Sequence, residues 1–319
     1  MRTHPFILSL ICLLLTVASA RAQFKEGGTP GGPELGEAKP QRWKIGISVT
    51  ASGGACTGIA GYVPVPREWP EQEVRDVEDE VSPSAKISYR TVDNSVRLMV
   101  VKIRRLPASQ TAKAIVTYEV THRPQLPPET TDQYVTADTK KMGRDLRRYL
   151  GTSPYIESRH PKIRKLAKEI GVDKATAWEQ VEAVYDWVRD KVEYKNGPLK
   201  GALAALKDGT GDCEEMTSLF IAICRAKDIP ARTVWVQGHC YPEFYLEDKE
   251  GKGRWFPCQV AGSRAFGGIP ETRPILQKGD NFRALDKSRE RKHYLNTVVT
   301  GDRFGGQPRV REIYQAVGK

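Results

Sequence analysis

The chain has 319 residues, of which 39% are hydrophobic and 28% are charged, and a formal net charge of +11. This composition is typical of a globular protein with room for two domains, and it excludes a disordered or collagen-like chain. The Lys and Arg residues are spread among 39 acidic residues and form no nucleic-acid recognition motif, so we predict no nucleic-acid partner. Association with an anionic cell surface stays open, but an ordinary solvated surface explains the charge better.

Residues 1–22 have the composition of a secretory signal peptide. Arg2 and His4 precede an apolar run that ends in small residues, which offer A-x-A cleavage sites. The run is too short for a comfortable membrane span. We therefore expect an exported protein, secreted or periplasmic, without a transmembrane span. Residues 23–42 are rich in Gly, Pro, Glu and Lys, which is typical of a flexible linker.

Residues 43–125 are expected to form a small β-sandwich, for packing or for substrate docking. Apolar and polar residues alternate in four stretches, namely 43–49, 85–89, 96–103 and 114–120. Pro64, Pro66 and Pro70 indicate a loop or a sheet edge rather than a central strand. A Pro-Pro pair at 127–128 marks the expected boundary to the next domain.

The second domain is expected over residues 126–281 and begins with helices. Helical spacing of apolar residues predicts four of them, at about 140–150, 161–170, 174–192 and 199–207. Gly171 is expected to end the second helix, and Asp173 to cap the third. Residues 261–281 are expected to form a loop that borders a cleft. The basic extension 282–319 shows helical spacing near its end and predicts a docking helix.

The stretch from Gly209 to Val260 carries the candidate chemistry. Cys213 directly precedes an apolar run with helical spacing, and the start of a helix favours a thiolate. Asp212 is expected to cap this helix. Strands are predicted over 232–236, 239–246 and 254–260, with a hairpin loop between the last two. A cysteine at a helix start, a histidine on one strand and a polar side chain on the next indicate a nucleophile, a base and an orienting group.

These residues resemble the transglutaminase-like superfamily. Its G-x-C helix, I-P-A-R turn, H-x-x-x-E strand and W-x-P-x-D strand match Gly211 with Cys213, residues 229–232, His239 with Glu243, and Trp255 with Pro257. The resemblance implies an α+β protein with a papain-like core, Cys213 as nucleophile and His239 as base. It also implies an exported bacterial type with an N-terminal β domain. Gln259 stands where the family usually has Asp; a neutral amide can still accept a hydrogen bond from the imidazole, but it stabilises an imidazolium less.

Five cysteines follow the predicted signal peptide, and an odd number suggests one free thiol, which suits Cys213. If His239 and Gln259 face each other on antiparallel strands, Cys240 must oppose Cys258. We then expect either a disulfide between these two or two buried thiols. Cys224, one turn after Phe220, is expected in the core.

The favoured hypothesis is a thiol acyl-transfer enzyme that acts on a peptide or protein. Cys213 would attack a carboxamide, His239 would transfer the proton and Gln259 would orient the imidazole. Hydrolysis is favoured over crosslinking because water is always available, and the alternative is an inactive binding module with the same fold. No cofactor is expected, nor a metal, because His239 and Cys240 are strand neighbours and point to opposite faces. Glu243 is expected as a solvated strand charge, and the oligomeric state stays open.

Overall fold

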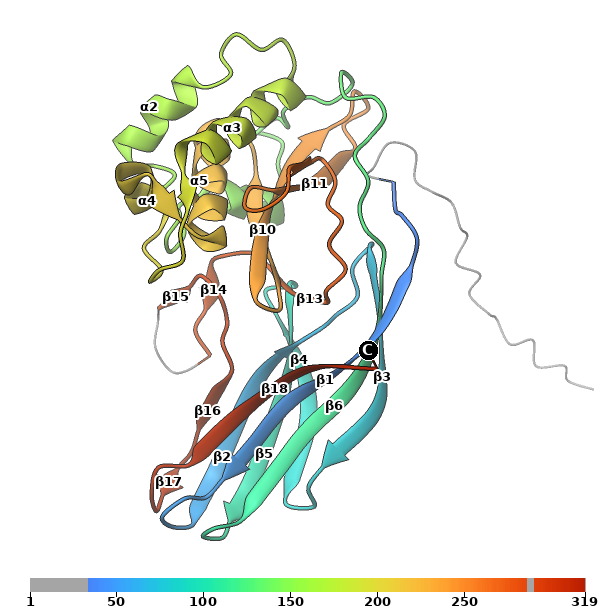
Figure 1. The fold of residues 1–319 in the computed structure, drawn as a ribbon, viewed down its shortest axis with the longest axis vertical. Helices are drawn as coiled ribbons and strands as arrows, with labels where there is room; N and C mark the ends of the chain where they lie inside the picture. The colour runs from blue at the N-terminus through green and yellow to red at the C-terminus, as the bar shows by residue number, and fades with distance from the viewer. Residues whose placement is uncertain (1–33, 286–289, 319) are drawn as a thin grey trace, which may run out of the picture. The chain divides into compact units, whose positions relative to one another are not determined.

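A computed structural model describes residues 34–285 and 290–318. The predicted signal peptide and most of the predicted linker lie outside the described residues. The fold class is α+β, as predicted: a β-sheet region comes first, and a core of helices and strands follows (Figure 1). Within the described part, no helix has the length and apolar character needed to cross a membrane.

The N-terminal region is a sandwich of two antiparallel layers. One layer has the order β18-β1-β6-β3, with bounds Arg309–Val317, Lys39–Thr50, Thr111–His122 and Gln72–Val81. The other contains β4, β5, β2, β16 and β17, with bounds Ala85–Val92, Val96–Leu106, Cys56–Val65, Val298–Thr300 and Arg303–Phe304. Alternate side chains from both layers, such as Ile47 and Val101, fill a common core, as half-buried sheets require.

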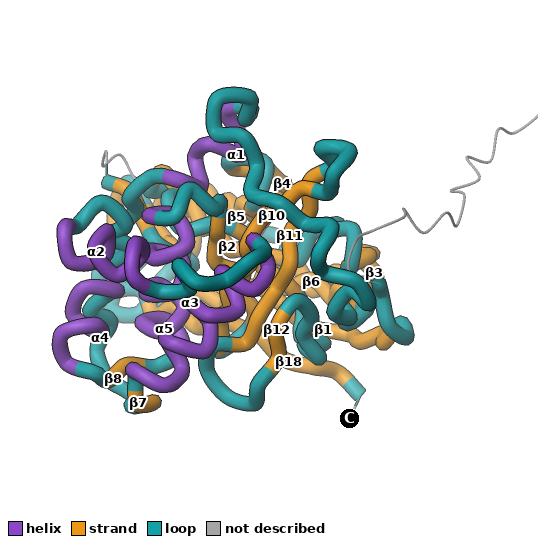
Figure 2. Tube along the Cα trace, turned by 90° about the horizontal axis from the view of Figure 1, so that it is seen from above, coloured by secondary structure: helices purple, strands orange, loops and turns teal. Residues whose placement is uncertain are grey.

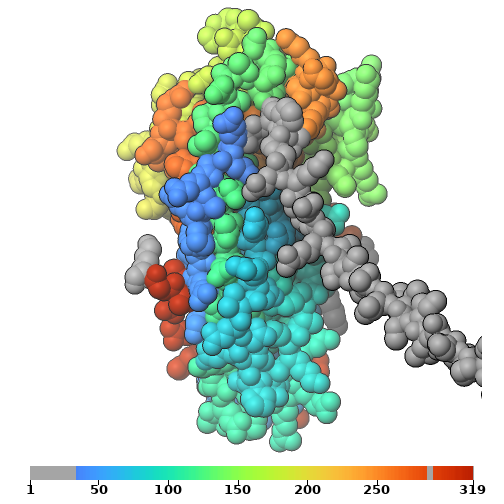
Figure 3. Space-filling view, turned by 90° about the vertical axis from the view of Figure 1, so that its right-hand side faces the viewer, coloured from blue at the N-terminus to red at the C-terminus, as the bar shows by residue number. Residues whose placement is uncertain are grey.

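Each of the four predicted strand stretches lies inside an observed strand, and the sequence missed the two that do not alternate cleanly. One is β3, an edge strand whose charged side chains are mostly exposed, seen in cyan in Figure 3. The other is β2, which contains Pro64. Proline fits there because the pairing of β16 with β2 ends at Tyr62, so no ladder hydrogen bond is lost on that side.

The predicted docking helix at the C-terminus is wrong, because residues 309–317 form the strand β18. This strand pairs with β1 from Arg42 opposite Val317 to Thr50 opposite Arg309, and the Tyr314 hydroxyl donates to the carbonyl of Pro64 at 2.9 Å. Pairing with a distant strand thus overrides a weak local helical spacing. The predicted linker also ended too late, because β1 already begins at Lys39.

The helices of the second region group on one side in Figure 2. They are α1 Arg144–Arg147, with a 3-10 turn at Arg148–Leu150, α2 Pro161–Glu169, α3 Ala177–Lys191, α4 Ala202–Asp208 and α5 Cys213–Ala226. Gly171 follows α2 with φ of 65°, as predicted for a residue that ends a helix. The N-cap of α3 is Thr176, not Asp173, because Thr176 forms a capping box with Glu179.

The core strands β9 Ala231–Val236, β10 His239–Glu247 and β11 Gly253–Gln259 follow α5. The predicted loop 261–281 contains two short strands, β12 Ala265–Phe266 and β13 Ile275–Lys278. β13 pairs with β9 and also meets Val96 of β5 through Gln277. One sheet, β12-β11-β10-β9-β13-β5-β2-β16, therefore runs through both regions. Two small ladders complete the structure: β7 Glu193–Tyr194 with β8 Thr210–Gly211, and β14 Phe282–Arg283 with β15 Arg291–Lys292.

A network of buried charges lies where β9, β10 and β13 meet. The Lys278 ammonium contacts Glu71 at 2.5 Å and Glu243 at 2.6 Å, and Arg232 contacts the same Glu243 at 2.7 Å. The prediction that Glu243 is a solvated strand charge is therefore wrong, since its side chain is fully buried. Nearby cations lower its pKa against the effect of desolvation, so it stays ionised.

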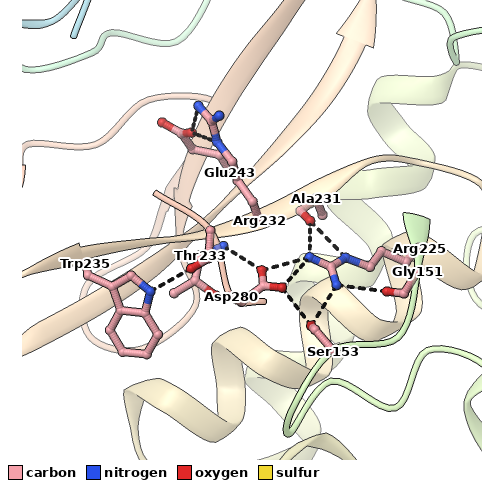
Figure 4. Close-up of polar contacts among 10 residues, drawn as sticks. Gly151, Ser153, Arg225, Ala231, Arg232, Thr233, Trp235, Glu243 and Asp280 are labelled. Carbon is pink, nitrogen blue, oxygen red and sulfur yellow. Dashed lines mark hydrogen bonds and ion pairs between the residues drawn. The ribbon is translucent and has the colours of Figure 1, made fainter. Parts of the chain in front are cut away.

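A second buried pair joins the end of α5 to the residue after Gly279. The Arg225 guanidinium contacts the Asp280 carboxylate at 2.7 Å, with both side chains 1% exposed. Arg225 also donates to the carbonyls of Gly151 and Ala231, as Figure 4 shows. Each charge of the pair thus depends on the other for its solvation.

We predict that Asp280→Ala lowers the free energy of unfolding by about 3–5 kcal/mol, because it leaves Arg225 charged and buried without its partner. Urea denaturation measures this change. The control is Asp173→Ala, which removes an exposed carboxylate and should change the free energy of unfolding by less than about 0.5 kcal/mol. Equal, small effects in both variants would contradict the importance of the pair.

Candidate active site

Cys213 is the first residue of α5 and follows a well-formed cap. The Asp212 carboxylate accepts a hydrogen bond from the Glu214 N–H at 2.8 Å, and the Glu215 carboxylate accepts one from the Asp212 N–H at 3.1 Å. This capping box confirms the predicted role of Asp212. A side chain at Gly211 would meet Glu215, with its Cβ only 2.5 Å from that of Glu215. The local sequence therefore fixes the start of the helix at the cysteine.

The structure brings His239 and Gln259 together. His239 is the first residue of β10, and its Nε2 lies 3.4 Å from Oε1 of Gln259, the last residue of β11. The backbone carbonyl of Gln259 accepts hydrogen bonds from the Tyr185 hydroxyl at 2.9 Å and from Arg189 at 3.0 Å. Helix α3, which carries both donors, thus holds Gln259 in place. With Nε2 turned to the amide, Nδ1 is the ring nitrogen left for another partner.

The Cys213 thiol has a strongly lowered pKa, of about 4. The largest cause is a hydrogen bond with the Cys240 side chain, followed, after the opposing effect of burial, by one with His239. The backbone N–H of Cys240 also favours the charged form. Three donors and the start of the helix therefore stabilise a thiolate at neutral pH. Neighbouring residues in a strand point to opposite faces, yet His239 and Cys240 both stabilise the thiolate. His239 is the first residue of β10.

The register predicted for the strands β10 and β11 differs from the observed register by two residues. Glu243 lies opposite Pro257 in the β10–β11 ladder, so Cys240 does not lie opposite Cys258. Both are buried free thiols, and of the two alternatives the disulfide is thus wrong. A displacement by two keeps each side chain on its face of the sheet. Burial raises the pKa of Cys240 and of Cys258 well above the usual value, so Cys240 acts as a neutral donor.

Several residues at this site were missed or given another role. Burial, together with the charge of Cys213, raises the pKa of Glu214 to about 7. Burial raises the pKa of Tyr194, and the nearby charge of Cys213 raises it further. Arg273, whose pKa is raised chiefly by its hydrogen bond to Glu271, also lies close enough to feel that charge.

One further prediction concerns packing. Cys224 lies in the core, as predicted, and its side chain is fully buried. Trp235 and Tyr241 are buried as well, and the Trp235 indole donates to the carbonyl of Gly279 (Figure 4). In residues 34–285 and 290–318, no group of three or more His, Cys, Asp or Glu side chains is placed to hold a metal ion.

Comparisons with known proteins concern the family of the core and the fold. Residues 164–260 match the model of the transglutaminase-like superfamily, which confirms the resemblance seen in the sequence. A crystal structure from Cytophaga hutchinsonii, described as a "Putative Cysteine Protease", has a TM-score of 0.60 at 18% identity and covers 90% of this chain and 93% of its own. At this identity it shows a shared fold, of an N-terminal β region and a transglutaminase-like core.

A second crystal structure, described as a "putative protease" from Parabacteroides distasonis ATCC 8503, is 14% identical and covers 73% of this chain and 48% of its own. Its TM-score is 0.28. Among curated proteins, none matches the sequence.

We predict that alkylation of Cys213 by iodoacetamide is nearly independent of pH between about 6 and 8, because a thiol with a pKa of about 4 is ionised throughout that range. The rate should fall only as the pH approaches 4. His239→Ala removes one donor to the thiolate, so the midpoint should move to higher pH. Mass spectrometry of the labelled peptide gives the rate, and Cys213→Ser is the control. A rate that still rises tenfold per unit up to pH 8 would refute a lowered pKa.

Variants of Gln259 test its contact with His239. Gln259→Leu removes the acceptor for the imidazole N–H, so we expect the midpoint of the alkylation profile to move to higher pH by roughly 0.7 units, which corresponds to one hydrogen bond of about 1 kcal/mol. Gln259→Asp keeps an acceptor and should keep or lower the midpoint. Gln307→Leu, at an exposed position, is the matched control. Equal midpoints in all variants would show that residue 259 does not orient the imidazole.

Proposed function

We propose that this chain, whose residues 164–260 form a transglutaminase-like domain, is an exported thiol enzyme that cleaves peptide or carboxamide bonds in protein substrates. Cys213 is the nucleophile, His239 the base and Gln259 the orienting group. Two features support the proposal: Nε2 of His239 lies 3.4 Å from the amide oxygen of Gln259, and the His239 side chain helps to lower the pKa of Cys213 to about 4.

The chemistry follows from the protonation states. The Cys213 sulfur attacks the carbonyl carbon, and a C–S bond forms as the carbonyl π electrons move to oxygen. The N–H of Cys213 at the first helical position has no acceptor within the helix, and it can donate to that oxyanion. The imidazolium of His239 then protonates the departing amine, and the C–N bond breaks to leave a thioester.

Water completes the reaction. His239, now neutral, takes a proton from water as the oxygen attacks the thioester, and the thiolate of Cys213 leaves with the C–S electron pair. Gln259 keeps Nε2 occupied, so that Nδ1 faces the reacting atoms in both half-reactions. An amine in place of water would give a crosslink instead. We favour hydrolysis because water is always present, and because the structure from Cytophaga hutchinsonii is described as a "Putative Cysteine Protease".

Fluorescein-labelled casein tests the activity. The wild-type chain should release labelled peptides and new amino groups, and Cys213→Ala should lower the rate by about a thousandfold or more, since a missing nucleophile removes the chemical step. The other described cysteines are all buried, so wild-type protein alkylated at Cys213 serves as a second inactive control. Incorporation of dansylcadaverine, measured in the same reaction, separates crosslinking from hydrolysis.

The outcomes are distinct. Release of amino groups that depends on Cys213 supports a hydrolase, whereas incorporation of the amine without peptide release would assign crosslinking. The second candidate is a binding module, for which the neutral Gln259 in place of a carboxylate is the supporting observation. Rapid alkylation of Cys213 without either reaction, across a panel of protein substrates, would favour that module.

A further inference from the structure

An arginine-lined cavity lies at the end of α5 that is opposite to Cys213. It has a volume of about 510 Å³, within the range of small-molecule sites. Its walls come from the 3-10 turn at Arg148–Leu150, from the start of α2 and from the last turn of α5. Arg225, on that last turn, is twelve residues from the cysteine, which corresponds to roughly 18 Å along the helix. The cavity is therefore separate from the candidate active site.

Every basic residue that lines the cavity is an arginine: Arg147, Arg148, Arg159, Arg164 and Arg225. Lysines are equally common in the surrounding segment but lie elsewhere, since Lys162 and Lys165 on α2 line a different pocket. An ordinary solvated surface would mix the two types. Arginine differs from lysine in its planar fork, which binds phosphate and carboxylate oxygens in pairs. The selection of arginine thus points to anion recognition.

The charges of these five arginines are only partly balanced within the protein, since one carboxylate, that of Asp228, lines the cavity with them. Arg225 is neutralised by Asp280 and forms the floor, and Arg148 has Asp93 at 3.9 Å. Arg159 and Arg164 are exposed, and no carboxylate of the described residues lies within ion-pair distance of either. Like charges gathered around one cavity repel each other, and an anion in the cavity would relieve that repulsion.

Two uncharged features, a helix terminus and a serine hydroxyl, also favour an anion in the cavity. Helix α2 has nine residues and begins at Pro161, two residues after Arg159 of the cavity wall, and Arg164 on this helix lines the cavity as well, so the positive end of the helix dipole lies near the cavity. Ser158 lines the cavity, is 2% exposed, and has only a long contact of 3.4 Å to the Thr152 hydroxyl. Its hydroxyl can therefore rotate to donate to a bound oxygen.

We propose that this cavity binds a phosphate-bearing ligand with at least two negative charges, such as a pyrophosphate or a phosphomonoester. One carboxylate would leave most of the arginine charge unbalanced, and the volume leaves room for the molecule that carries the phosphate. Arg159 and Arg164 hold the phosphate oxygens, and Ser158 donates a further hydrogen bond. The same group could belong to a free metabolite or to a lipid headgroup. The inference does not depend on the proposed activity of Cys213.

Isothermal titration of the full chain with sodium pyrophosphate, at constant ionic strength, tests the site. We expect one ligand per chain, and an affinity that falls by about tenfold or more in Arg159→Gln/Arg164→Gln, since two charge-assisted contacts are lost. The matched control is Arg104→Gln/Arg105→Gln, which removes the same charge from exposed positions on β5 and should leave the affinity unchanged. Circular dichroism shows that each variant is folded.

Vesicles of phosphatidylglycerol and phosphatidylcholine distinguish the two sources. If pyrophosphate displaces the chain from these vesicles, the site binds the phosphate of a lipid headgroup. If the chain binds pyrophosphate but not the vesicles, the ligand is a free molecule. Both results support the cavity. No binding of pyrophosphate at millimolar concentration, or an equal loss in both double variants, would overturn the proposal. Vesicle binding that pyrophosphate does not reduce would instead indicate that a basic surface outside the cavity binds the vesicles without specificity.

Discussion

Charges removed from water require partners of opposite charge, and this constraint joins the parts of the protein. Lys278 of β13 lies between Glu71, which precedes β3, and Glu243 of β10. An unpaired ion in this place would cost several kcal/mol. β13 must therefore lie beside β9 for the charges to be matched, and from there it also reaches β5. The continuous sheet and the position of β10 follow from that match.

The same constraint acts at Cys213, where neutral donors stabilise the charge. The thiolate is half-buried, and burial alone would raise the pKa of the thiol. The hydrogen bonds from Cys240 and His239 outweigh that effect. Because β10 supplies both residues, the strand that the buried ions hold in the sheet also favours the ionised form of Cys213. Strand β10 thus contributes both to the stability of the sheet and to the ionisation of Cys213.

Helix α5 connects two different chemical environments. Its first residue is Cys213, the proposed nucleophile, and its last turn carries Arg225, which is fully engaged with Asp280 and with backbone carbonyls. The core face between these ends packs against Phe244 and Phe256 of the sheet. A helix so firmly held can present Cys213 in a fixed position while its other end forms the floor of the arginine-lined cavity.

The sequence by itself determined the local features of this protein. Helical spacing after Cys213, the cap at Asp212 and the alternating stretches at 43–49 and 96–103 each depend on neighbours within a few residues, so they could be predicted. The match of motifs in the right order also indicated the family of the core. Such patterns express intrinsic preferences of the backbone and the burial of one face.

Only the tertiary structure decided features that depend on distant partners. The end of the chain forms β18 because β1 offers an unpaired edge, and Glu243 is ionised in the interior because Lys278 and Arg232 meet it there. The register of β10 on β11, which separates Cys240 from Cys258, moved by two residues without changing any face, and no local pattern distinguishes the two registers. These features depend on contacts between segments far apart in the sequence, and no local pattern in a single sequence predicts such contacts.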